Sequence, residues 1–489
     1  MVTKRTPFGV FDALLETIPA FNGHDGRGLV YPIPILILNL TVAVGEAVVT
    51  GFIVEHLNAL SSCTMKTLPS LNEAIHHFRN FLVSGGGLTL ALFILIHGFI
   101  FGFLFHLYLT TNTDIGLYFA DASKLASGLV PYRDFTLEYP PLSLIFFGLP
   151  RIITSSDALY TKIFQYELLV FDIIGLLLIF DIARRLGERP WKALSIYTLA
   201  VLAVGPIIIQ TYDIIPAVMT LAAIYLFWRG NHKASWAVLA LGTLTKIYPI
   251  VIAPIFLLIY FKNGQLKQIR DGAIIFLAVC AIAILPFIIL GSGSILNLVS
   301  YHSQRPVQIE STYSAIVLTL VKLGFTTVTA EFSFGSLNIV NPAATVLAKL
   351  STYIMVGSLL IVYWFIYRQV KPGKSQFTRL GAYALLTIAI TMATSKILSP
   401  QYFVWLIPIF PLICGRWRTP ILATFILIGG LTYDIFPLHY PELQNFQATA
   451  VAILVARDIL LVLLAVLAVV SLKRMPASNE PSGPLNAPR

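Results

Sequence analysis

Charged side chains are scarce in this sequence. Lys, Arg, Asp and Glu together make up 11% of the 489 residues, whereas soluble proteins carry about 25%. Hydrophobic residues make up 57%, and the mean hydropathy is +0.81. A chain this apolar has more surface to bury than a water-soluble enzyme can hide, and it is too hydrophobic to remain disordered. The composition excludes both classes and predicts an all-α polytopic membrane protein.

The sequence also lacks the usual patterns for disulfides and bound metals. Its three cysteines, Cys63, Cys280 and Cys414, are widely spaced and imply neither a disulfide framework nor a metal cluster. No two acidic residues stand two positions apart, so there is no Asp-x-Asp motif for a metal and a nucleotide sugar. His97 and His106 share no ligand-like spacing with another His or Cys, and we expect them in the core or at an interface. We therefore expect no metal and no cofactor.

Long apolar runs are what the sequence does contain. A helix needs about 20 apolar residues to cross the hydrocarbon core of a bilayer, and twelve apolar runs can be placed along the chain, although several are too short to cross alone. Residues 31–54 would add a thirteenth span, but Glu46 and two prolines weaken that segment. We predict 12 to 13 transmembrane helices. The twelve runs lie near 88–108, 165–183, 192–209, 214–229, 234–246, 247–261, 272–291, 345–367, 379–395, 401–414, 419–435 and 449–471.

Basic residues are distributed unevenly between the short loops that join these runs. One set of loops holds fifteen Lys and Arg residues, and the alternating set holds two. Because short cytoplasmic loops collect Lys and Arg, the first set is predicted to be cytoplasmic. The two long loops, 109–164 and 292–344, then lie on the exoplasmic face. The positive formal charge of +10 therefore reflects basic residues on the cytoplasmic side of the membrane, and we expect no nucleic-acid partner. The basic loops are 183–192, 229–233, 262–271, 368–379 and 415–418.

The chain divides into three parts. Residues 1–87 form an N-terminal extension of unknown role, in which 31–54 is either an extra span or an interfacial appendage. Residues 88–472 form a multi-pass transmembrane domain, which we place in the cytoplasmic membrane with its long loops facing outward. The last segment, 473–489, contains four prolines and is predicted to be a disordered cytoplasmic tail.

The first long loop places a carboxylate at the membrane surface. Asp114 follows the first span by a few residues, and the apolar spacing from 115 to 127 predicts a helix along the interface. A carboxylate here can take a proton from an alcohol that attacks another molecule at the bilayer surface. It can equally be the N-cap of the interfacial helix. Position alone leaves both interpretations open.

Three further acidic residues of the same loop have simpler explanations. Asp121, Asp134 and Glu138 can pair with Lys124 or Arg133, or cap turns. A structural role is favoured for each of them over direct participation in chemistry.

Three basic residues lie on the predicted exoplasmic face, where the short loops contain few Lys and Arg residues. Arg305 lies in the second long loop, and Lys246 and Lys396 are the two basic residues of the short exoplasmic loops. The planar fork of Arg suits a phosphate because it donates two parallel hydrogen bonds. Together the three residues would build a cationic pocket for a lipid-linked phosphate. Either Lys alone can also snorkel to a lipid headgroup.

Charged residues in or near the predicted spans suggest a different class of protein. A secondary transporter or a lipid-linked sugar flippase would use Glu167, Asp172, Arg457 and Asp458, although such groups more often neutralise one another. Arg457 and Asp458 are adjacent and do not face each other on a helix, so we expect their partners elsewhere. Polar residues concentrate in the exoplasmic loops rather than at the bilayer midplane where transporters bind. That distribution favours an enzyme.

Several motifs occur in order along the chain. The first, 114–141, contains Pro-Tyr-Arg-Asp-Phe and Tyr-Pro-Pro, and the others are 244–249, 301–311 and 398–402. These motifs resemble the glycosyltransferase C superfamily. They are most similar to its family 87, the polyprenol-phosphate-mannose-dependent mannosyltransferases and their arabinofuranosyl relatives. The similar span pattern runs from about residue 88 to the C terminus.

The resemblance implies an inverting transfer of a sugar from a polyprenyl monophosphate to a hydroxyl of a lipid or glycan on the exoplasmic side. It implies that Asp114 is the general base and that His302 lies near the reacting groups. Arg305, Lys246 and Lys396 are our candidates for the donor phosphate. Mannose is expected, but mannose and arabinofuranose donors share the lipid and the phosphate that the motifs report. Further possible substrate contacts are Asp121, Tyr132, Arg133, Asp134, Glu138, Tyr139, Tyr301, Gln308 and Glu310.

Overall fold

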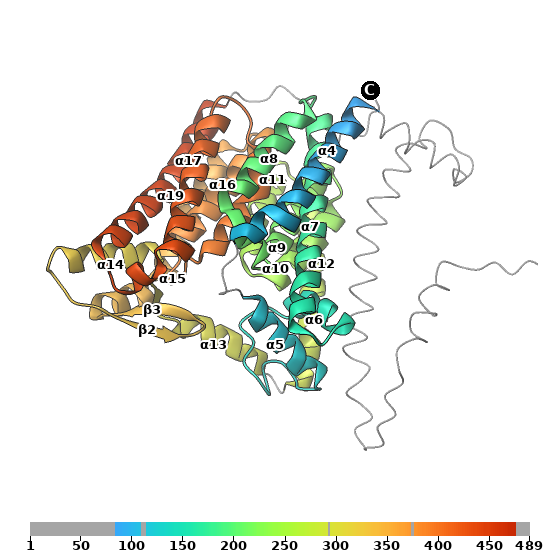
Figure 1. The fold of residues 1–489 in the computed structure, drawn as a ribbon. Helices are drawn as coiled ribbons and strands as arrows, with labels where there is room; N and C mark the ends of the chain where they lie inside the picture. The colour runs from blue at the N-terminus through green and yellow to red at the C-terminus, as the bar shows by residue number, and fades with distance from the viewer. Residues whose placement is uncertain (1–83, 109–113, 292–293, 373–375, 476–489) are drawn as a thin grey trace, which may run out of the picture. The chain divides into compact units, whose positions relative to one another are not determined.

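The computed structural model describes residues 84–108, 114–291, 294–372 and 376–475. This part of the chain is almost entirely helical (Figure 1), so the predicted all-α class is confirmed. The possible span at 31–54, most of the N-terminal extension, Cys63 and nearly all of the tail lie outside the described residues.

Eight helical segments of the described chain are long and apolar enough to cross a membrane, which makes this an integral multi-pass membrane protein. Their outward faces are rich in exposed Leu, Ile, Val and Phe, as expected for surfaces that contact lipid. The eight segments are α4 (Gly85–Phe99) with η1 (Ile100–Leu104) and η2 (Phe105–Tyr108), α7 (Asp157–Arg185), α8 (Pro190–Val204) with η3 (Gly205–Ile209), α12 (Leu266–Leu290), α15 (Pro342–Gln369), α16 (Phe377–Thr394), α17 (Arg418–Tyr433) with η7 (Asp434–Leu438), and α19 (Ala448–Arg474).

The other four predicted spans are shorter helices. Three of them are α9 (Ile214–Trp228), α10 (His232–Thr245), and η4 (Tyr248–Ile252) with α11 (Ala253–Lys262). The fourth, η6 (Pro400–Leu412), is a 13-residue 3₁₀ helix that packs between α8, α9 and α16. Two internal prolines lack the N–H that an α-helix needs. Because a 3₁₀ helix rises about 2.0 Å per residue, these 13 residues cover roughly 26 Å.

The polar loops and the basic loops fall at opposite ends of the helices. The chain reverses direction between successive spans, so the five Lys- and Arg-rich loops share one end. The other end carries the short helices α5 (Ile115–Ala126), α6 (Ser143–Ile153), α13 (Asn297–Gln304) and α14 (Thr312–Lys322), as Figure 1 shows. The predicted helix over 115–127 is confirmed by α5. Which end faces the cytoplasm stays a prediction.

The second long loop also contains a small antiparallel sheet that the sequence did not lead us to expect. Its strands β1 (Val307–Gln308), β2 (Thr329–Ser333) and β3 (Ser336–Val340) lie in the order β1-β3-β2. Phe334 and Gly335 turn β2 into β3, both with positive φ, 52° and 68°. Two such residues form a type I′ turn, which normally carries Asn-Gly. A buried cluster that includes Val307, Ile309 and Leu454 holds the sheet against α19.

The charged residues inside the helices are mostly paired within the protein. His97 Nδ1 lies 2.6 Å from Asp172 Oδ2, so the expected core position of His97 is confirmed. Arg457 Nη2 lies 2.8 Å from Asp458 Oδ1, which makes our argument against pairing of these neighbours wrong. The guanidinium is long enough to fold back onto the next side chain, and it also reaches Glu310 at 3.6 Å. Within the part of the chain that the structure describes, the carboxylate oxygens of Glu167 have no hydrogen-bond partner.

Candidate active site

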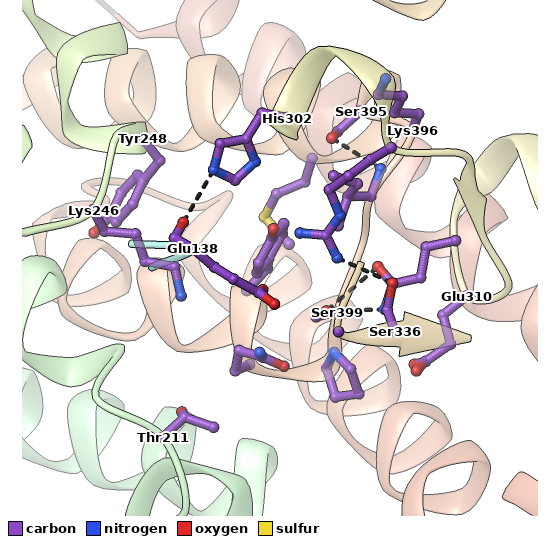
Figure 2. Close-up of a pocket in the computed structure, with 18 of the residues that line it drawn as sticks. Glu138, Thr211, Lys246, Tyr248, His302, Glu310, Ser336, Ser395, Lys396 and Ser399 are labelled. Carbon is purple, nitrogen blue, oxygen red and sulfur yellow. Dashed lines mark hydrogen bonds between the residues drawn. The ribbon is translucent and has the colours of Figure 1, made fainter. Parts of the chain in front are cut away.

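One cavity of about 740 Å³ collects residues from both long loops and from several helix ends. It lies at the end that carries α5, α13 and the sheet. Figure 2 shows Lys246 and Thr211 on one side of the cavity, Lys396, Ser336 and Glu310 on the other, and His302 and Glu138 between them. The predicted site residues that line it are Asp114, Glu138, Tyr139, Lys246, His302, Arg305, Gln308, Glu310 and Lys396.

Asp114 stands at the N-cap position of α5, but its side chain makes no cap hydrogen bond. The N-cap interpretation is therefore wrong for the side chain. Its Oδ2 instead accepts hydrogen bonds from Gln401 Nε2 at 3.3 Å and from the Tyr118 hydroxyl at 3.4 Å. Burial raises the pKa of Asp114 to about 6, against a smaller lowering effect of the Lys246 charge. A carboxylate with this pKa is ionised at neutral pH and is basic enough to accept a proton.

Lys246 is held on the same side of the cavity by an acidic residue that our sequence reasoning missed. Its Nζ lies 2.5 Å from Asp213 Oδ1, and the same oxygen accepts a hydrogen bond from Trp405 Nε1 at 2.6 Å. The ammonium also lies 4.8 Å from the ring centre of Tyr212 and 5.5 Å from that of Tyr402. The positive charge of Lys246 is thus neutralised within the protein.

Arg305 and Lys396 are the cations of the cavity wall that form no ion pair within the described part of the chain. Arg305 is buried, and its Nη2 donates to Ser336 Oγ at 3.0 Å, while its Nε has no hydrogen-bond partner among the described residues. Lys396 Nζ donates to the backbone oxygen of Ser303 at 2.8 Å. Burial and the charge of Arg305 lower the pKa of Lys396. Two buried cations without a carboxylate favour the binding of an anion between them.

His302 is held as a neutral imidazole beside these cations. Burial and the charges of Arg305 and Lys396 lower its pKa. Its Nε2 lies 3.1 Å from the backbone oxygen of Glu138. Since a carbonyl oxygen only accepts, Nε2 carries the proton, and Nδ1 is left as an acceptor.

Glu138 faces the cavity rather than a basic partner in its own loop, which differs from the structural role that we favoured. Burial raises the pKa of its carboxyl group. A Cβ placed on Gly335 would lie 2.5 Å from Glu138 Oε1, so the tip of the β2–β3 hairpin packs directly on this carboxylate. The two long loops therefore meet at Glu138.

Five of the predicted contacts lie outside the cavity wall. Asp121 pairs with Lys124 at 3.1 Å, and Arg133 pairs with Asp134 at 2.8 Å, as the structural interpretation proposed. The Tyr132 hydroxyl donates to the backbone oxygen of Tyr139 at 2.7 Å. The ring of Tyr301 packs against His302 and Phe334 behind the wall. The residues outside the wall are Asp121, Tyr132, Arg133, Asp134 and Tyr301.

Four further residues shape the site and were given no role from the sequence: Asp213, Gln401, Tyr402 and Trp405. Gln401 and Tyr402 belong to one of the family-like motifs, which is the only signal that pointed to them. Asp213 is a single acidic residue in a short loop, and no sequence motif around it identifies it as a site residue. Among the described residues no three His, Cys, Asp or Glu side chains are grouped to hold a metal ion, and the expectation that none is needed stays a prediction.

A comparison with known protein families identifies the class of this protein. The model of glycosyltransferase family 87 matches residues 135–391, just over half of the chain. The chain belongs to glycosyltransferase family 87. The match includes Lys246, His302 and Arg305, whereas Asp114, Lys396 and Gln401 lie outside it. No curated protein matches the chain. Membership of family 87 makes this protein a membrane glycosyltransferase and favours the enzyme over the transporter.

Proposed function

We propose that this glycosyltransferase moves a hexose, mannose, from a polyprenyl monophosphate to a hydroxyl of a lipid or glycan on the exoplasmic face, with inversion at the anomeric carbon. The observation that carries the proposal is a basic carboxylate, Asp114, that shares one cavity with two cations, Arg305 and Lys396, which form no ion pair within the described residues. An inverting displacement requires this pairing, because the acceptor and the leaving phosphate stand on opposite faces of the sugar.

Asp114 takes the proton of the acceptor hydroxyl while the hydroxyl oxygen forms the new bond to the anomeric carbon. The bond between that carbon and the phosphate oxygen breaks, and the phosphate leaves with the electron pair. Arg305 and Lys396 stabilise the charge that the phosphate gains, so the phosphate needs no proton to leave. A positioned base contributes about 10²- to 10⁴-fold to such a reaction.

Lys246 acts on the base side rather than on the phosphate. Its ion pair with Asp213 and its place beside Asp114 support this assignment, since its charge lowers the pKa of the base. Two of the three predicted phosphate ligands, Arg305 and Lys396, therefore contact the donor, and Lys246 has a different role.

The prenyl chain follows the apolar extension of the cavity. Apolar residues of the cavity wall that could contact the prenyl chain include Met355 of α15, Met392 of α16 and Ile247. Burial of a long hydrocarbon chain holds the donor without a nucleotide, at about 0.8 kcal/mol per CH₂. The exoplasmic assignment is supported by the basic loops, which lie at the opposite end of the helices.

The proposed reaction is tested with the purified full-length protein, radiolabelled polyprenyl-phosphate mannose and a membrane extract as the source of acceptor. We expect label to enter a lipid or glycan product from this donor and not from GDP-mannose. Asp114→Asn keeps the size of the side chain but removes the base, so the rate should fall by about 10²- to 10⁴-fold. The matched control is Asp121→Asn on the same helix, which should transfer normally. Full activity of Asp114→Asn, or transfer from GDP-mannose, would contradict the proposal.

A further inference from the structure

Three aromatic rings are stacked in one wall of the cavity. The ring centres of Tyr248 and Trp405 are 4.0 Å apart with planes at 3°, and those of Trp405 and Tyr402 are 4.1 Å apart at 22°. Tyr248 and Trp405 are buried, whereas Tyr402 is half-buried, and all three line the cavity. Of the described rings, Trp405 alone stacks on Tyr402. Tyr402 is thus the outermost ring of the stack: Trp405 covers one of its faces, and the half-buried ring lines the cavity.

The stack is held firmly from behind. Trp405 Nε1 donates to Asp213 Oδ1 at 2.6 Å, and the Tyr248 hydroxyl accepts from Thr220 Oγ1 at 3.2 Å. Fixed rings lose little conformational freedom when a ligand binds, so their contact surface is preorganised.

The position of Tyr402 matches that of the sugar in the proposed reaction. The preceding residue, Gln401, holds the base Asp114, and the same short segment begins with the phosphate candidate Lys396. The seven residues 396–402 therefore include a candidate ligand of the donor phosphate, Lys396, and a residue that contacts the proposed base, Gln401. A sugar bonded to the phosphate and within reach of Asp114 lies beside the ring of Tyr402.

We propose that the ring of Tyr402 binds one face of the transferred sugar and thereby selects a hexopyranose over an arabinofuranose. This inference rests on the proposed function and decides between the two donors that the motifs do not distinguish. A β-linked mannopyranose has its C1, C3 and C5 hydrogens axial on one side, and the acceptor attacks C1 from that same side. The ring of Tyr402 therefore lies against C3 and C5, whose axial hydrogens form an apolar patch, and leaves C1 open to the acceptor. These C–H bonds carry partial positive charge and are attracted to the negative face of an aromatic ring.

An arabinofuranose fits this surface less well. Its five-membered ring is puckered and lacks this pair of parallel axial C–H bonds, so it covers less of the tyrosine face. The hydroxyl of Tyr402 is not needed for the contact, whereas the flat ring is.

The test measures how much the sugar adds to binding. The purified full-length wild type, Tyr402→Phe and Tyr402→Leu are titrated with farnesyl phosphate, its β-mannosyl ester and its arabinofuranosyl ester. In the wild type and Tyr402→Phe, mannose should increase the affinity over that of farnesyl phosphate. In Tyr402→Leu the mannosyl ester should bind about tenfold more weakly, while farnesyl phosphate and the arabinofuranosyl ester should bind as before. Tyr353→Leu, at a side chain of α15 that is 76% exposed, is the matched control.

Any other result contradicts either the inference about Tyr402 or the proposed donor class. If Tyr402→Leu weakens all three ligands equally, the residue has a structural role only, and the inference is wrong. If Tyr402→Leu keeps the full contribution of mannose, or weakens only the arabinofuranosyl ester, the inference fails while the proposed function stands. If the wild type binds none of the three, the proposed donor class fails, and the inference falls with it.

Discussion

The proposed role of Asp114 as a general base depends on its burial. The desolvated carboxyl group has a pKa of about 6, and the negative charges of Asp213 and Glu138 add to the rise. A general base works only when it is unprotonated. With polyprenyl-phosphate mannose as donor, kcat/KM should therefore rise with pH, reach half of its maximum near pH 6 and level off above. Below that point it should fall about tenfold per pH unit.

Lys246→Met tests the origin of this pKa. The ammonium lowers the pKa of Asp114, and its removal also leaves the carboxylate of Asp213 unpaired. Both changes disfavour the ionised form of the base, so the midpoint of the pH profile should move to higher pH. A lower rate with an unmoved midpoint would show that Lys246 does not set the pKa of the base.

Arg305 and Lys396 should determine donor affinity more than acceptor affinity. Removal of a charge-assisted hydrogen bond costs about 1.5–3 kcal/mol, or roughly 10- to 100-fold. We expect Arg305→Ala to weaken binding of polyprenyl-phosphate mannose by this factor, with Lys396→Ala acting in the same direction and the acceptor KM little changed. Arg270→Ala, at an exposed side chain near the basic loops, is the control. Unchanged donor affinity would remove both residues from the phosphate site.

The contact of α17 with α8 depends on one of two neighbouring glycines. A Cβ on Gly429 would run into the backbone oxygen of Ala203, whereas a Cβ on Gly430 would meet nothing within 4 Å. Gly429→Ala should therefore lower the melting temperature, because one helix must move away from the other. Gly430→Ala should leave it unchanged or raise it, since Ala is favoured over Gly in a helix by about 1 kcal/mol. Equal melting temperatures of the two variants would show that α17 and α8 can move apart at little cost in stability.

The 3₁₀ helix η6 shows how one short apolar run extends farther than an α-helix of the same length. The hydropathy of 401–414 predicts a membrane segment, but it carries no information on how far each residue advances along the helix axis. Pro408 and Pro411 disfavour the α-helix, and neighbouring helices supply the packing that an exposed 3₁₀ helix would lack. The segment places Gln401 and Tyr402 at its first turn, inside the cavity.

The orientation of the whole protein is open to a direct test. In a variant whose native cysteines are replaced, Ser155→Cys lies at the cavity end and Lys267→Cys at the basic end, and both positions are exposed. A membrane-impermeant maleimide added to intact cells should label the first and not the second, because basic loops stay in the cytoplasm. The reverse pattern would put the cavity on the cytoplasmic side.

The sequence by itself determined the class of this protein, the positions of most spans and the identity of the base and cation candidates. The class and the spans follow from hydropathy over about 20 residues, and the cation candidates follow from the side on which Lys and Arg collect. The choice of Asp114 as the base followed from the resemblance to family 87, because its position alone left two interpretations open. The structure brings all five principal candidates, Asp114, Lys246, His302, Arg305 and Lys396, to one cavity wall.

Only the tertiary structure decided how these residues are paired. Gln401 contacts Asp114 across 287 positions of the chain, and Trp405 contacts Asp213 across 192. No local pattern encodes such contacts, because they depend on how the helices pack and how far each one advances along its axis. The same packing neutralises Lys246, leaves Arg305 and Lys396 without an ion-pair partner among the described residues, and places Tyr402 in the cavity wall.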